Sequence, residues 1–318
     1  MSSLLARRWL PEAALLFVVV IWSTTWIAMK DALKQIDPLA FMSARFVCIA
    51  LLAWSLLHIR LHGDRSASRI DRADWARLTA GGLIGYSAYQ LCSVFALDRS
   101  SVFTISLLVA LVPLFTMIMM FASGEALPAY GPYGLALAVL GVIVFLSDKR
   151  EAGDSLSGAI LSLGAAVSFA AYGLINRPLV RKYQPDVLAS WQLLIGTIPM
   201  IFIGFRSILD QSWSQVTARV WLGIVFVIIF PVYIAYQLWN FGIARRGAAV
   251  ASSYGLLVPI LSAVLAVIFF SEVITWLKIG GAAMAIAGLI VVRIPEGWSP
   301  RSIGMGRTIC RATPSGQD

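Results

Sequence analysis

Long apolar runs separated by short polar segments make up most of this chain. Ten of these runs are long enough to cross a bilayer as α-helices, which takes about 20 residues. The predicted spans cover residues 13–29, 39–57, 78–97, 102–122, 129–146, 156–175, 187–205, 220–244, 248–270 and 273–292. Only α-helices and closed β-barrels span a bilayer, and the strands of a barrel need only about ten residues each. The pattern therefore predicts an all-α integral membrane protein with ten transmembrane helices.

A stripe of polar side chains interrupts the third span. Tyr86, Tyr89, Gln90 and Ser93 fall within about a quarter-turn of one another on an α-helix. Polar groups are costly to place against lipid tails. The stripe must therefore face either a neighbouring helix or a water-filled cavity.

A second stripe of the same kind lies in the eighth span, 147 residues further along the chain. Tyr233, Tyr236, Gln237 and Asn240 occupy the four corresponding positions, with asparagine in place of serine. Hydrogen bonding between packed helices is a sufficient explanation for one such stripe. Two stripes at one fixed offset favour the lining of a transport path, because many transporters are built from repeats.

The same offset relates the two halves of the whole chain. Glu125 and Glu272 share it, as do one proline and two glycines of each half. We therefore expect two repeats, residues 1–147 and 148–294, each with five spans. Because five is odd, the second repeat enters the membrane from the opposite face, which makes the pair inverted-topology repeats.

The distribution of positive charge predicts how the chain is oriented. The sequence is 59% hydrophobic and carries a net charge of +9. With the N-terminus in the cytoplasm, 16 Lys and Arg lie in cytoplasmic segments and 8 in external segments. This excess predicts that both termini are cytoplasmic, so the charge does not indicate a nucleic-acid partner. The polar and basic residues 295–318 are expected to form a disordered cytoplasmic tail.

Arg45 is the charged residue that lies well inside a predicted span. An arginine at this depth either extends to the membrane surface or meets an anionic group in a cavity, and both interpretations stay open. We include Arg45 among the candidate substrate-binding residues, together with Trp22 and Trp26 of the first span.

Four ordered motifs resemble those of the drug/metabolite transporter superfamily, specifically its ten-helix EamA-type permeases. They are Val20-Ile21-Trp22-Ser23 with Trp26, Pro38 followed by Arg45-Phe46, Leu111-Val112-Pro113 with Gly124-Glu125, and Leu257-Val258-Pro259 with Ser271-Glu272. Ser271 departs from the glycine usual in that family. The resemblance covers about residues 10–294. It implies a multi-pass carrier of the bacterial inner membrane, often an amino-acid exporter, with a cavity between its halves.

The leading functional hypothesis is a secondary transporter that exports amino acids or related metabolites by alternating access. The lipid bilayer and a small-molecule substrate are the expected partners, and the oligomeric state stays open. One alternative is a permease that takes up drugs or other metabolites. Another is a membrane-embedded lipid-modifying enzyme, which the absence of His, Asp and Glu well inside the spans disfavours. Three cysteines without ligand spacing predict no metal, and no cofactor is expected.

Overall fold

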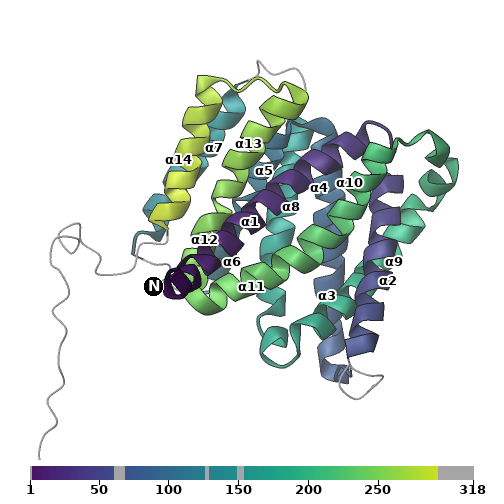
Figure 1. The fold of residues 1–318 in the computed structure, drawn as a ribbon. Helices are drawn as coiled ribbons and strands as arrows, with labels where there is room; N and C mark the ends of the chain where they lie inside the picture. Colours follow the sequence, from purple (N-terminus) through teal and green to yellow (C-terminus); the bar gives the residue numbers. More distant parts are fainter. Residues whose placement is uncertain (1, 61–68, 126–128, 149–153, 293–318) are drawn as a thin grey trace, which may run out of the picture.

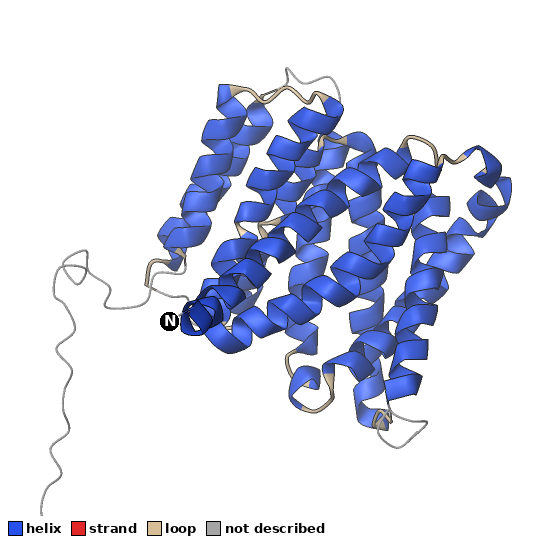
Figure 2. Ribbon diagram, viewed as in Figure 1, coloured by secondary structure: helices blue, strands red, loops and turns tan. Residues whose placement is uncertain are grey.

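The computed structural model describes residues 2–60, 69–125, 129–148 and 154–292, and all regular structure in these ranges is helical (Figure 2). In the first half, the helices are α1 (Ser2–Leu33), α2 (Pro38–Arg60), η1 (Arg72–Asp74), α3 (Trp75–Gly82), η2 (Leu83–Ala88), α4 (Tyr89–Arg99), α5 (Val102–Val109), α6 (Val112–Ala122) and α7 (Gly131–Ser147). In the second half, they are α8 (Leu156–Asn176), η3 (Leu179–Arg181), α9 (Pro185–Asp210), η4 (Trp213–Gln215), α10 (Ala218–Ile229), η5 (Phe230–Ile234), α11 (Ala235–Arg246), α12 (Ala248–Gly255), α13 (Leu257–Phe270) and α14 (Trp276–Val291). The predicted tail, residues 295–318, lies outside the described residues.

Ten apolar helical segments of the described chain match the ten predicted spans. Eight are long and apolar enough to cross a membrane, and α7 and α14 are shorter apolar helices. Large apolar side chains such as Phe202 and Trp276 point outward, as expected of a surface that contacts lipid. The prediction of an all-α membrane protein is confirmed, and the helices fit two five-helix units.

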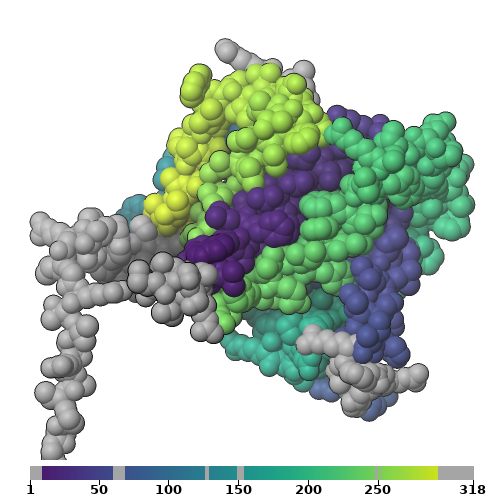
Figure 3. All heavy atoms as spheres, viewed as in Figure 1, coloured from purple at the N-terminus to yellow at the C-terminus, as the bar shows by residue number. Residues whose placement is uncertain are grey.

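The helices of the two units interleave. Helix α1 of the first unit contacts α10, α11 and α13 of the second unit. The space-filling view shows α1 in the centre of one face, with second-unit helices on both of its sides (Figure 3). The interface between the two units is therefore built largely around α1.

Two predicted spans are interrupted by a break that the apolar pattern did not reveal. The fourth span divides into α5 and α6 at Ala110 and Leu111, and the ninth into α12 and α13 at Leu256. In each case a proline, Pro113 or Pro259, lies in the first turn of the second piece. Proline lacks the amide proton that a continuous helix needs, but it is well suited to a helix start.

The third and eighth spans each contain a π-helical turn, η2 and η5, and the two turns begin 147 residues apart. In η5, Pro231 has no amide proton to donate to the carbonyl of Val227, four residues earlier. A π turn takes more residues per turn than an α-helix. Tyr86 lies in η2, so the α-helical periodicity assumed for the first stripe holds only from Tyr89 onward.

Helices α7 and α14 pack side by side along one flank of the molecule, and α2 and α9 along the opposite flank (Figure 1). Glycines allow the backbones of α7 and α14 to approach closely. A Cβ on Gly141 would overlap the backbone of Ala285, and one on Gly281 would overlap that of Phe145. Close contact between small residues is a main source of helix association in membranes.

The contacts between α2 and α9 are reciprocal with respect to the offset of 147. The hydroxyl of Ser43 donates to the carbonyl oxygen of Met200 at 2.7 Å. The hydroxyl of Ser190 donates to the carbonyl oxygen of Ala53 at 3.3 Å. Moving each residue to its counterpart in the other half converts the first bond into the second.

The glycine contact between α7 and α14 gives a test with a neighbouring control. Gly281→Ala should destabilise the protein by about 1–3 kcal/mol, because the added methyl group has no space. Gly280→Ala is the control, since a Cβ there meets nothing within 4 Å. The measurement is the thermal unfolding temperature of the purified protein in detergent. Equal unfolding temperatures for the two variants would contradict the packing.

Candidate functional site

Five tyrosines from three helical spans gather where the two units meet. They are Tyr86 on η2, Tyr89 on α4, Tyr172 on α8, Tyr233 on η5 and Tyr236 on α11. The hydroxyls of Tyr86 and Tyr172 lie 3.5 Å apart, and their rings pack edge to face at 5.7 Å. Tyr86 also lies within electrostatic range of Tyr233 and Tyr236, and Tyr236 within range of Tyr89. We call these five residues the tyrosine cluster; four of them come from the two predicted stripes.

The amide and hydroxyl groups of the two stripes have different exposure. Gln90 and Ser93 are buried, with 6% and 1% of their surface exposed, whereas Gln237 and Asn240 are exposed. Tyr236 is 49% exposed although it lies beside other members of the cluster. The second stripe is therefore the more accessible of the two, and its exposed side chains lie on α11.

The guanidinium of Arg45 is buried on α2 with few partners. Arg45 is 7% exposed, and its Nε has no hydrogen-bond partner among the described residues. One Nη donates to the sulfur of Met29 at 3.6 Å, and the other to the carbonyl oxygen of Val227 at 3.5 Å. Val227 is the residue whose carbonyl Pro231 leaves without its helical partner. Arg45 also lies within electrostatic range of Tyr89, a member of the tyrosine cluster.

Gln192 occupies the position equivalent to Arg45 in the second half, and its polar groups are hydrogen-bonded. Gln192 is fully buried, and its Nε2 donates to Oδ1 of Asn176 at 2.7 Å. Asn176 donates back to Oε1 of Gln192 at 3.3 Å. Asn176 is the counterpart of Met29, so the two halves make the same contact with different chemistry. Arg45 is the member of the pair that retains unused donors.

The two candidate tryptophans pack rather than join the cluster. The ring of Trp22 lies 5.1 Å from that of Trp239, and Trp26 packs against the main hydrophobic core. Two aromatic residues that the sequence reasoning missed are Tyr172 and Phe169, whose rings lie 5.6 Å apart on α8. The signal available for Tyr172 was a phenol near the end of an otherwise apolar span.

The two ends of the bundle also differ. We call them the Lys30 end, where α1, α4 and α13 finish, and the Arg177 end, where α8 finishes. At the Lys30 end, the Nζ of Lys30 donates to the carbonyl oxygens of Leu97 and Ser100 at 2.5 and 2.9 Å. Glu272 accepts from the first amides of α5 there. Burial raises the pKa of the Glu272 carboxyl, and the amide donors oppose this rise.

A second polar network at the Lys30 end surrounds Asp154. Its carboxylate accepts from the amide of Ser101 at 2.7 Å and from the hydroxyl of Thr104 at 2.7 Å. Lys278, which is 1% exposed, forms an ion pair with it at 2.6 Å. Asp154 and Lys278 belong to the second unit and Ser101 and Thr104 to the first, so this network joins the two units.

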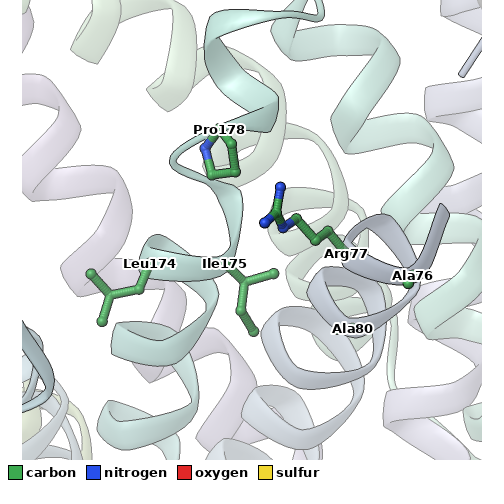
Figure 4. Close-up of a pocket in the computed structure, with 6 residues that line it drawn as sticks. All are labelled: Ala76, Arg77, Ala80, Leu174, Ile175 and Pro178. Carbon is green, nitrogen blue, oxygen red and sulfur yellow. The ribbon is translucent and has the colours of Figure 1, made fainter. Parts of the chain in front are cut away.

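A pocket of about 380 Å³ opens at the Arg177 end (Figure 4). Its lining comes from the beginning of the third span and the end of α8, namely Ala76, Arg77, Ala80, Leu174, Ile175 and Pro178. The close-up shows the guanidinium of Arg77 extending from α3 towards Pro178. The surface of the Arg177 end is thus indented between these two segments.

Many membrane transporters are helical bundles of two related units with polar residues gathered between them. The EamA-like transporter family matches the chain twice, over residues 9–147 and 156–294. The chain belongs to this family.

Individual relatives are distant but similar along nearly the whole chain. An uncharacterized transporter of Archaeoglobus fulgidus is 25% identical and covers 90% of this chain and 98% of its own. A probable amino-acid metabolite efflux pump of Escherichia coli is 26% identical, covering 87% and 92%. A solved crystal structure shares the fold with a TM-score of 0.60 at 20% identity, covering 89% and 96%.

The exposure of α11 predicts which positions water reaches. A cysteine replacing Gln237 should react with a water-soluble thiol reagent at least about tenfold faster than one replacing Val225, because thiols react as hydrated thiolates. Val225 is 49% exposed on α10, where we expect lipid. A cysteine replacing Gln90 should react slowly as well. The rates are measured in a chain whose native cysteines are replaced by serine; equal rates at 237 and 225 would mean that Gln237 faces lipid.

Proposed function

We propose that this protein is a secondary transporter that exports amino acids or related small metabolites across the bacterial inner membrane. Membership of a transporter family and similarity to a probable amino-acid metabolite efflux pump support this proposal. The observation that carries it is Arg45, a buried cation beside the tyrosine cluster that forms no ion pair among the described residues. The family supports transport, not catalysis, as the activity of the chain.

A substrate carboxylate would supply the charge partner that Arg45 lacks. An unpaired buried charge is costly, and a carboxylate can accept two parallel hydrogen bonds from one guanidinium. The tyrosine rings offer faces for an apolar side chain or an ammonium group. Gln237 and Asn240, which are exposed, offer amide donors and acceptors. This set of groups suits a small zwitterion or carboxylate.

We propose alternating access between two inverted repeats, residues 1–147 and 148–294, as the transport mechanism. The reciprocal hydrogen bonds of Ser43 and Ser190 support it, because a two-fold relation between halves produces paired contacts of this kind. The excess of Lys and Arg in alternate loops supports cytoplasmic termini. The Lys30 end then faces outward and the Arg177 end faces the cytoplasm.

Arg45→Met tests the binding role, because methionine fills similar space without the charge. Export should fall about tenfold to a hundredfold, which corresponds to the loss of a charged hydrogen bond worth about 1.5–3 kcal/mol. The unfolding temperature should stay equal or rise, since a buried charge without a partner is removed. Arg45→Lys should keep part of the activity, as it retains the charge without the two-pronged geometry.

The assay begins with intracellular amino-acid pools compared with and without the gene, which identifies a substrate for efflux measurements. Arg206→Met is the matched control, because this arginine is exposed and pairs within its own helix with Asp210. Undiminished export by a well-expressed Arg45→Met variant would remove Arg45 from the binding site.

A further inference from the structure

Glu272 joins the two units at the Lys30 end. Its carboxylate oxygens accept from the amide nitrogens of Val102 and Phe103 at 2.8 and 3.4 Å. These amides belong to the first turn of α5, where the helix has no earlier carbonyl to bind. A carboxylate at this position also interacts favourably with the helix dipole. Glu272 lies just beyond α13, so the bond links the second unit to the first.

Glu125, the counterpart of Glu272, does not make the equivalent bond. Its carboxylate forms an ion pair with Arg177 at 2.7 Å, in which both side chains are about half exposed. The counterparts of Val102 and Phe103 are Ala249 and Val250, which lie in the first turn of α12. Glu272 therefore binds the first turn of a helix, whereas Glu125 binds a basic side chain.

The basic partners show the same difference. Lys30 binds the carbonyl oxygens that end α4, at Leu97 and Ser100. Arg177 occupies the equivalent position in the second half, yet it pairs with Glu125 instead. At the Lys30 end, the acid Glu272 and the base Lys30 bind the ends of different helices. At the Arg177 end, the acid and the base bind each other.

The adjoining helix surfaces show an independent difference between the ends. Ile27 of α1 and Ile224 and Val227 of α10 are buried in one hydrophobic core. Their counterparts across the offset are Leu174, Arg77 and Ala80, three of the residues that line the pocket in Figure 4. The positions that are packed at the Lys30 end thus line an open pocket at the Arg177 end.

We propose that Glu272 and Glu125 are alternating latches of the transport cycle, an inference that rests on the proposed transport function. Glu272 holds α5 while the Lys30 end is closed. When that end opens, Glu272 leaves α5, and Glu125 leaves Arg177 to accept from the amides of Ala249 and Val250. The Arg177 end then closes. Released Glu272 pairs with Lys30, and released Glu125 pairs with Arg177.

A pair of equivalent cysteine reporters can test the exchange in membrane vesicles. Arg77→Cys lies in the pocket at the Arg177 end, and Ile224→Cys lies at the packed counterpart position, 8% exposed. Each is placed alone in a chain without native cysteines. The quantity measured is the rate of labelling at 224 divided by the rate at 77, using a small water-soluble thiol reagent.

The two latch variants should move this ratio in opposite directions. Glu272→Gln keeps the shape of the side chain but removes its charge, so the ratio should rise about tenfold. Glu125→Gln should lower the ratio, because closure of the Arg177 end loses its latch. Asp210→Asn, which alters an exposed acid paired on its own helix, should leave the ratio unchanged.

Any result other than opposed shifts overturns the proposal. Unchanged ratios would mean that the glutamates only stabilise the fold, and equal increases in both variants would indicate general loosening. If Glu272→Gln fails to fold, Glu125→Gln decides alone, since it removes only an exposed ion pair. Labelling needs no substrate, so opposed shifts in a chain that exports no amino acid would keep the latches and discard the proposed substrate.

Discussion

Lipid provides no hydrogen bonds, so every backbone polar group inside the membrane needs a partner within the protein. Most of this chain meets that constraint with continuous helices. Where the helices are interrupted, side chains take over: Arg45 approaches the carbonyl of Val227, and Glu272 and Lys30 hold the helix ends beside residues 100 and 101. The sites proposed for binding and gating lie at these interruptions. Such groups can bind a ligand or another helix, because no regular helical bond already occupies them.

The apolar pattern of the sequence was sufficient to predict the spans. The offset of 147 was sufficient to single out four of the five tyrosines that cluster in the structure. Tyr172 was not predicted because its counterpart is Thr25, so no repeated pattern marks it. Neither π turn was predicted, and η2 contains no proline such as Pro231 of η5 that could account for it. The different exposure of the two stripes could not be read from sequence, because their residue types are nearly the same.

The two halves differ in sequence at the positions that would orient a substrate in the proposed site. Met29 and Arg45 in one half correspond to Asn176 and Gln192 in the other, and only the second pair satisfies itself. A binding site made of identical groups on both sides would hold a carboxylate in two equivalent orientations. In the proposed site, the single guanidinium would hold the acidic end of a substrate near α2 in both access states.

The network around Asp154 has a consequence for the balance between the two states. Inverted repeats with matching contacts would make the two closed ends nearly equal in free energy. The counterparts of Ser101, Thr104 and Lys278 are Ala248, Ala251 and Gly131, which cannot form such a network at the Arg177 end. The Arg177 end is held instead by other ion pairs between the units, those of Lys182 with Asp71 and Asp74. In the cycle proposed above, the two ends therefore differ in the free energy needed to open them, and a substrate shifts that balance only by the difference in its affinity for the two states.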